Sequence, residues 1–277
     1  MSLLWGMIGL IGLIGLTGCA PLQLKDRADH ILQAQGFQPV QGQVTLKAWL
    51  RTGPTSSAPP LRRLRVYIEG DGAAWWSHTL PPTDPTPGFS VALDLAASDA
   101  HTDVAYLARP CQYLNAQTRA MCPYSWWTDA RHGTEVQSQM QQRLDLMIAQ
   151  SGAGQLELIG HSGGGTMAVL LAATRRDVAC LVTLAAPLDL QAWTGHHRVA
   201  PLHLSQDPAL LPSGQPTAPA AYLFGERDGV VPAHTIGRYA QRVKPGQLVV
   251  MPEWGHTRGW SHRDAWQAHT GCMAALP

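Results

Sequence analysis

The stretch Leu156-Glu157-Leu158-Ile159-Gly160-His161-Ser162-Gly163-Gly164-Gly165 decides the fold of this chain. Its first four residues predict a strand, and the apolar residues 166–173 that follow it predict a helix. A serine between glycines at a strand-to-helix junction has the G-x-S-x-G pattern that exposes a nucleophilic hydroxyl in a sharp turn. Gly160 and Gly164 lack the Cβ atoms that would collide there, and the helix dipole favours negative charge at Ser162. We therefore predict that Ser162 is a nucleophile. The alternative is a glycine-rich turn that happens to contain serine.

The composition sets broad limits on the class of protein. The chain has 277 residues, which is enough for one large α/β domain with a sizeable core. The formal net charge is only +1 and the basic residues are scattered, so no nucleic-acid partner is expected. Ten tryptophans in a chain with 14% charged residues are compatible with an aromatic-lined apolar cleft.

The first residues predict a targeting segment outside the folded domain. Leu3–Leu16 is apolar apart from glycines and is too short to span a bilayer comfortably. It ends in Leu16-Thr17-Gly18-Cys19, which resembles the lipobox of bacterial lipoproteins. The resemblance implies that residues 1–18 are a signal peptide and that Cys19 carries a lipid. Because alanine and not aspartate follows the cysteine, it also implies an envelope protein held in the outer membrane and facing the periplasm. No Lys or Arg precedes the apolar run, and the alternatives are an uncleaved anchor or a different start codon.

Four other cysteines are interpreted in the light of this oxidising compartment. An even set in the periplasm favours disulfides, with three possible connectivities. Cys111 and Cys122 bracket a short polar loop and are the preferred pair, whereas Cys180 and Cys272 either pair or stay as buried thiols. The chain has no C-x-x-C motif, so a zinc site is not expected.

Strands and helices alternate through most of the chain, which predicts a mostly parallel sheet with helices on both faces. Residues 19–60 are expected to add a helix, a strand at 42–51 and a loop to this sheet, and residues 61–277 to form the main domain. Residues 111–129 and 188–217 are predicted to be irregular. The strands are expected at 64–68, 103–107, 156–159, 180–187, 220–225 and 248–251, and the helices at 26–35, 91–97, 135–150 and 166–173.

The second chemical stretch is Leu64-Arg65-Val66-Tyr67-Ile68-Glu69-Gly70-Asp71-Gly72, a predicted strand that runs into a glycine-containing loop. Here the chain resembles the α/β-hydrolase superfamily, from about Leu61 to its end. In that superfamily one backbone donor for the oxyanion follows the nucleophile and another comes from an early strand loop. The resemblance implies that the N–H groups of Gly163 and Asp71 fill these roles. The superfamily often has His-Gly in this loop, where this chain has Glu69-Gly70, and the alternative is an ordinary turn.

The resemblance also implies an acid and a base. Asp228 follows the predicted strand 220–225, where the superfamily places its acid, and Glu226 is the fallback. His256 follows the last predicted strand, and histidine is the natural general base near neutral pH. Ser162, Asp228 and His256 occur in the superfamily's order of nucleophile, acid and base. The other candidate bases are His262 and His269, in a predicted closing helix.

Together these residues predict a lipid-anchored serine hydrolase of the α/β-hydrolase type. Asp228 is expected to accept the Nδ1–H of His256, and His256 to take the proton of Ser162. The expected substrate is a small acyl compound, with an ester as the default, and no cofactor is needed. Adjacent histidines at 196 and 197 diverge on either a strand or a helix, so no metal is expected. The alternatives are an amidase, peptidase or thioesterase with the same triad, or a non-catalytic envelope lipoprotein that uses the fold as a binding module.

Overall fold

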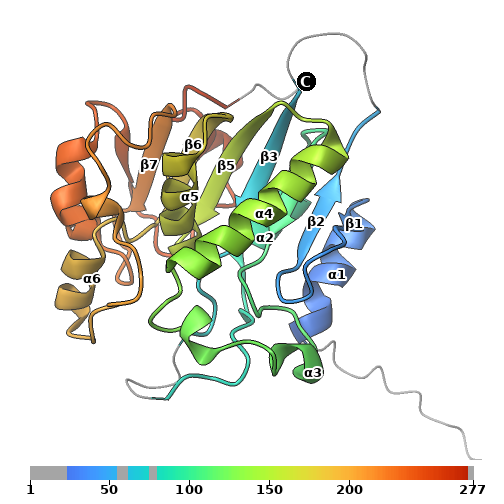
Figure 1. Ribbon diagram of the computed structural model, residues 1–277. Helices are drawn as coiled ribbons and strands as arrows, with labels where there is room; N and C mark the ends of the chain where they lie inside the picture. The colour runs from blue at the N-terminus through green and yellow to red at the C-terminus, as the bar shows by residue number, and fades with distance from the viewer. Residues whose placement is uncertain (1–23, 55–61, 75–79, 274–277) are drawn as a thin grey trace, which may run out of the picture.

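One eight-stranded sheet organises the molecule (Figure 1). The computed structural model describes residues 24–54, 62–74 and 80–273, so the predicted signal peptide and Cys19 lie outside the described residues. The strand order is β1-β2-β4-β3-β5-β6-β7-β8. Pairing is parallel from β4 through β8, and β1 and β2 are antiparallel at one edge. The strands are β1 (Gln38–Pro39), β2 (Ala48–Arg51), β3 (Arg63–Ile68), β4 (Val104–Leu107), β5 (Gln155–His161), β6 (Val178–Leu184), β7 (Ala220–Gly225) and β8 (Leu248–Met251).

Helices cover both faces of the sheet, and in Figure 1 α4 and α5 lie in front of it and α2 behind. Among the described residues no helix is both long and apolar enough to cross a bilayer. The helices are α1 (Leu24–Ala34), α2 (Val91–Ala97), α3 (Ala116–Arg119), α4 (Thr134–Ser151), α5 (Gly163–Thr174), α6 (Leu190–His197) and α7 (Arg263–Gln267), with 3₁₀ segments η1 (Tyr124–Trp126), η2 (Pro208–Leu210) and η3 (Ala233–Arg242).

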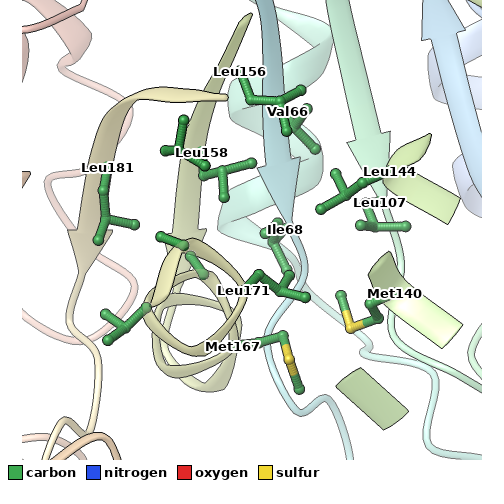
Figure 2. Close-up of a cluster of buried hydrophobic side chains, with 14 of the residues drawn as sticks. Val66, Ile68, Leu107, Met140, Leu144, Leu156, Leu158, Met167, Leu171 and Leu181 are labelled. Carbon is green, nitrogen blue, oxygen red and sulfur yellow. The ribbon is translucent and has the colours of Figure 1, made fainter. Parts of the chain in front are cut away.

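Alternation along the central strands divides the core into two layers. Successive side chains of a strand point to opposite faces of the sheet. On β3, Val66 and Ile68 therefore pack under α4 and α5, whereas Tyr67 packs on the other face with α1 and α2. The layer under α4 and α5 is shown in Figure 2, where Met140, Leu144, Met167 and Leu171 of the helices meet Leu107, Leu156, Leu158 and Leu181 of the strands.

Several parts of the sequence-based prediction were wrong. The strand expected at 42–51 is confined to β2, at its end, and residues 42–47 form bends and irregular backbone. Helices lie inside both segments that were expected to be irregular: the short α3 inside 111–129, and α6 inside 188–217. The start of α6 has a recognisable signal, because the side chain of Asp189 accepts a hydrogen bond from the Ala192 N–H at 3.0 Å as an N-cap. The neighbouring prolines and histidines concealed it.

Two disulfides hold loops of the molecule. Cys111 pairs with Cys122, as predicted, across the loop that contains α3, with their Cα atoms 6.1 Å apart. Cys180 of β6 pairs with Cys272, beyond α7, with a Cα separation of 5.3 Å. Of the two possibilities that the sequence left open for Cys180 and Cys272, the structure has the pair. The second bridge joins the C-terminal segment to the sheet.

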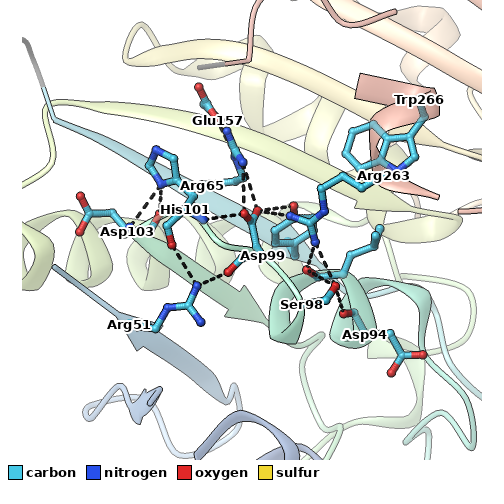
Figure 3. Close-up of polar contacts among 12 residues, drawn as sticks. Arg51, Arg65, Asp94, Ser98, Asp99, His101, Asp103, Glu157, Arg263 and Trp266 are labelled. Carbon is cyan, nitrogen blue, oxygen red and sulfur yellow. Dashed lines mark hydrogen bonds and ion pairs between the residues drawn. The ribbon is translucent and has the colours of Figure 1, made fainter. Parts of the chain in front are cut away.

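A buried ion-pair cluster crosses the face of the sheet that packs on α2 (Figure 3). The guanidinium of Arg65 lies 2.8 Å from Glu157 and 3.2 Å from Asp99, and all three side chains are fully buried. Asp99 also contacts Arg263 at 2.6 Å and accepts a hydrogen bond from the Tyr67 hydroxyl at 2.6 Å. Burial acts to raise the pKa of Asp99, but Arg65 and Arg263 outweigh it and lower that pKa. The two arginines therefore favour the charged form of the buried Asp99 carboxylate.

We expect Arg65→Met to lower the free energy of unfolding by about 3–5 kcal/mol, because it removes the fully buried arginine that Glu157 and Asp99 share. Urea denaturation at pH 7 measures the change. Arg63→Met is the matched control: Arg63 lies on the same strand and contacts the same Glu157 at 3.4 Å, but its side chain is 35% exposed. That change should cost about 1 kcal/mol or less. Equal losses in the two variants would contradict the assignment.

Candidate active site

Ser162 occupies the strained turn between β5 and α5. Its φ and ψ are 53° and −130°, a backbone conformation that non-glycine residues rarely adopt and that clusters at functional sites. The flanking glycines are required sterically: a Cβ on Gly160 would lie 2.2 Å from the carbonyl oxygen of Gly164, and one on Gly164 would lie 2.3 Å from that of Ile68. The turn is thus built as the sequence predicts.

The structure brings Ser162, His256 and Asp228 into one hydrogen-bonded chain. Nε2 of His256 lies 3.1 Å from Oγ of Ser162, and its Nδ1 lies 2.9 Å from Oδ2 of Asp228. The carboxylate requires Nδ1 to be the donor, which leaves Nε2 free to accept the serine proton. Burial acts to raise the pKa of Asp228, but hydrogen bonds from His256, Val231 and Val230 lower it overall. Asp228 is therefore an anion that orients the imidazole.

The alternative acid and bases lie elsewhere. Glu226 is exposed, and its carboxylate accepts the N–H of Glu253 at 3.1 Å. His262 and His269 are also exposed. The expectation that both lie within the closing helix was wrong, because His262 precedes the first residue of α7 and His269 lies beyond its last residue.

His161 and Trp260 hold the backbone of His256, a role that the sequence analysis missed. Nε2–H of His161 donates to the carbonyl oxygen of His256 at 2.7 Å, and Nε1–H of Trp260 donates to the same oxygen at 2.9 Å. The imidazole rings of His161 and His256 are 4.9 Å apart. Burial and the neighbouring His256 lower the pKa of His161 to about 3, so it stays neutral and keeps this donor role. Its position before the nucleophile was the only signal in the sequence.

Two backbone donors beside Ser162 are unoccupied. Within residues 24–54, 62–74 and 80–273, neither the N–H of Gly163 nor that of Asp71 donates a hydrogen bond to the protein. Buried or partly buried N–H groups are normally paired, and Asp71 lines the same cavity as Ser162. These are the groups that the resemblance assigns to the oxyanion, and they remain available for one.

Glu69 fixes the loop that carries the second donor. Its Oε1 accepts the N–H of Gly70 at 2.7 Å, and its Oε2 accepts hydrogen bonds from the hydroxyls of Ser90 and Tyr106, with that of Tyr113 at 3.4 Å. Burial raises the pKa of Glu69. Glu69 thus stands where the superfamily often has histidine. The donors that enclose its carboxylate immobilise the turn at Gly70.

The carboxylate of Asp71 lies against Gly163, and two arginines offset its charge. Nη1 of Arg109 is 3.0 Å from Oδ1 and Nη1 of Arg131 is 3.1 Å from Oδ2, with His132 at 3.8 Å. Burial acts to raise the pKa of Asp71, but His132 (charged only at the low pH where Asp71 itself titrates), Arg131 and Arg109 outweigh it and hold that pKa well below its usual range. An unpaired carboxylate here would oppose negative charge on a bound substrate, so the arginines make the site compatible with an oxyanion. Nothing in the sequence pattern marked either arginine.

Gly163→Ala is expected to lower kcat/KM for ester hydrolysis about 100- to 1000-fold, the loss typical of one oxyanion donor. An added Cβ would lie 2.0 Å from Oδ1 of Asp71, so the carboxylate that Arg109 and Arg131 hold beside this donor must shift. Steady-state kinetics on a chromogenic ester, with a thermal melt of each variant, measures the effect. Gly195→Ala is the control, because a Cβ there meets nothing within 4 Å. An unchanged kcat/KM in Gly163→Ala would rule out the donor assignment.

Two adjoining cavities open at this site. The reaction cavity, of about 450 Å³, is lined by Ser162, His256, Asp71, Phe89, Val230 and other residues. The apolar cavity, of about 720 Å³, is lined largely by Val199, Ala200, Pro201 and Leu202. The two share Arg131, Trp193 and residues 72–74 as lining, so they adjoin. Among the described residues no group of three or more His, Cys, Asp or Glu side chains is arranged to hold a metal ion.

Comparison with known proteins identifies the architecture. No protein-family model matches the sequence, and no curated protein sequence matches it. The structure is similar to an α/β serine hydrolase homologue from Coxiella burnetii (TM-score 0.54, 15% identity, covering 86% of this chain and 97% of that one). It is also similar to Est1E from Butyrivibrio proteoclasticus (TM-score 0.53, 16% identity, covering 84% of this chain and 95% of that one). A third similar structure is an α/β serine hydrolase without a lid from Xanthomonas campestris (TM-score 0.50, 17% identity, covering 84% of this chain and 92% of that one). The chain has the α/β-hydrolase fold.

This α/β-hydrolase fold explains why distant residues meet. Strands β5, β7 and β8 run parallel, so the loops that follow them lie at one edge of the sheet. Ser162 follows β5, Asp228 follows β7 and His256 follows β8. Ligands of open α/β sheets bind at the carboxyl ends of the strands, which is where both cavities lie.

Proposed function

We propose that this protein is a serine hydrolase that cleaves carboxylic esters through an acyl-enzyme. The observation that carries the proposal is the hydrogen-bonded chain from Ser162 through His256 to Asp228, beside two unoccupied backbone N–H groups. Nucleophile, base, orienting acid and oxyanion donors are the complete requirement for acyl transfer by serine. The likeness to serine hydrolases at 15–17% identity supports the fold, and the chemistry is argued from the site itself.

In the proposed mechanism, Oγ of Ser162 bonds to the ester carbonyl carbon while Nε2 of His256 takes its proton. The carbonyl electron pair moves to oxygen, where the N–H groups of Gly163 and Asp71 stabilise the charge. Collapse breaks the bond to the alcohol, which leaves with the proton from His256. Water then adds to the acyl-enzyme and gives a proton to His256, and the carboxylic acid leaves as Ser162 regains its hydrogen. Asp228 stays ionised and stabilises the imidazolium throughout. None of these steps requires a cofactor.

The cavities support a small acyl substrate with an apolar portion. Binding sites are mostly apolar with a few placed polar groups, and the apolar cavity adjoins the reaction cavity through Trp193. A panel of p-nitrophenyl esters, thioesters and aminoacyl anilides tests the class of bond. We expect esters to give the highest kcat/KM. Faster cleavage of a thioester or an anilide would reassign the enzyme to that class while keeping the same residues.

Covalent labelling tests the reaction type directly. A fluorophosphonate probe should add to wild-type protein, and peptide mass spectrometry should place the adduct on Ser162. The adduct should be absent from Ser162→Ala and present in Ser205→Ala, a control whose hydroxyl donates to the Asp129 carbonyl away from the nucleophile. Folded wild-type protein that takes no label would instead favour a binding module built on the same fold.

We also propose that the chain is a lipoprotein of the bacterial envelope, anchored through Cys19 to the outer membrane on its periplasmic side. The lipobox-like Leu16-Thr17-Gly18-Cys19 supports this proposal. Mass spectrometry of the mature N-terminus should find a diacylglyceryl or triacylated cysteine at residue 19. Cys19→Ser should leave the protein unprocessed, and an unmodified Met1 in wild type would contradict the anchor.

A further inference from the structure

Arg131 lies where the reaction cavity meets the apolar cavity and lines both. The residue is 5% exposed. Its Nε donates to the carbonyl oxygen of Thr128 at 2.7 Å, and its Nη1 pairs with Asp71 at 3.1 Å. Nη2 makes no hydrogen bond to any described residue. One donor group of this largely buried guanidinium is therefore unpaired where the two cavities adjoin.

The charges around Arg131 do not balance. Two guanidiniums, of Arg109 and Arg131, face the single carboxylate of Asp71. Both Nη atoms of Arg109 already have acceptors, because besides Asp71 it donates to the carbonyl oxygens of Gly163 and Arg131. The ring of His132 is fully buried, and burial lowers its pKa to about 3, so it adds no charge near neutral pH. The cluster has an excess of one positive charge, which a desolvated site tolerates poorly without a counter-anion.

Within the described part of the chain no other carboxylate that lines these cavities forms an ion pair with Arg131. Glu69 attracts Arg109 electrostatically, but burial raises its own pKa, and its oxygens are enclosed by the Gly70 N–H and three hydroxyls. Asp129 lines the apolar cavity, but within the described part of the chain no ion pair joins it to Arg131. The histidines that line them are His161, His203 and His256, and a histidine supplies no negative charge.

We infer that this enzyme selects esters that carry a carboxylate, which binds Nη2 of Arg131 close to the scissile bond while an apolar portion of the substrate fills the apolar cavity. The inference rests on the proposed function and adds a substrate class to it. One excess positive charge matches one unit of negative charge, and charge-assisted hydrogen bonds from arginine to carboxylate are among the strongest in proteins. Arg131 is thus assigned as a specificity residue; it takes no part in proton transfer.

Matched substrates test this inference in the wild-type protein. One pair places the charge on the acyl side: p-nitrophenyl hemiglutarate against p-nitrophenyl pentanoate. The other places it on the alcohol side: the butyrate ester of 3-hydroxybenzoate against that of methyl 3-hydroxybenzoate. In at least one pair we expect the anionic ester to have a kcat/KM at least about tenfold higher, which corresponds to one charged hydrogen bond. The preference should shrink in 0.5 M salt to the extent that solvent reaches the site.

Variants then assign the preference to Arg131. Arg131→Gln should abolish it, and Arg131→Lys, which keeps the charge without the planar fork, should retain part of it. Arg227→Gln removes the same charge from an exposed side chain that pairs with Glu253, so it should keep the full preference. Thermal melts identify any loss of folding, and the lysine variant together with the wild-type pairs remains informative if the glutamine variant is unstable.

The outcomes separate this inference from the function beneath it. Labelling of Ser162 with equal kcat/KM in both substrate pairs would overturn the carboxylate preference and leave the serine hydrolase standing. A preference that survives in a folded Arg131→Gln would also overturn the assignment. If Ser162 takes no label and no ester is cleaved, the proposed function fails and the substrate class fails with it.

Discussion

Ser162→Ala is expected to lower kcat for ester hydrolysis about a millionfold, the loss measured when the nucleophile of a serine protease triad is removed. Without Oγ no acyl-enzyme forms. A water molecule must then attack the ester directly, although His256 is positioned to take a proton from Ser162 and not from water. Single-turnover and steady-state assays of one ester, at enzyme concentrations high enough to detect the residual rate, measure the change.

The fold should be unaffected by this change. The Ser162 N–H donates to the Leu184 carbonyl oxygen at 2.8 Å, a backbone bond that alanine keeps. Alanine must still adopt the positive φ of the turn, so a small change in melting temperature is compatible with the prediction. A folded Ser162→Ala that retains more than about a hundredth of the wild-type kcat would show that another group is the nucleophile.

Asp228→Asn is expected to lower kcat about 10,000-fold, as for the corresponding change in a serine protease triad. An amide in this position can donate to Nδ1 of His256, which places the imidazole proton on Nε2 and prevents it from accepting the serine proton. It also removes the charge that stabilises the imidazolium. The loss should appear in kcat, with little change in the binding of a substrate analogue.

Glu226→Gln is the matched control for Asp228→Asn. It makes the same chemical change two residues away, on an exposed side chain that was the fallback acid. We expect its kcat to stay within about twofold of wild type, since surface changes away from the reacting groups have small effects. If Glu226→Gln were the more damaging change, the acid would have been assigned to the wrong residue.

Local sequence patterns were sufficient for the elements nearest the chemistry. The run into Gly160-His161-Ser162 predicts both a buried strand and a turn that only small flanking residues allow, and the structure has β5, the strained Ser162 and α5 in that order. Asp228 and His256 were assigned because each follows a predicted strand in the order of nucleophile, acid and base that the resemblance to the superfamily implies. The prediction for the strand that contains β2 was too long, because the alternation from Val44 to Ala48 also occurs in a segment of bends that buries Leu46.

The sequence by itself determined which residue types end which strands, because hydrophobic periodicity and glycine sterics act over a few neighbouring residues. From those patterns came the parallel α/β arrangement, and the resemblance to the superfamily supplied the assignment of Ser162, Asp228 and His256. Only the tertiary structure decided what surrounds them. Arg109 and Arg131 come from separate loops to meet Asp71, and His161 reaches the carbonyl of His256 across 95 residues. Such contacts depend on the distance between segments in space, and a single sequence has no local signal for that distance.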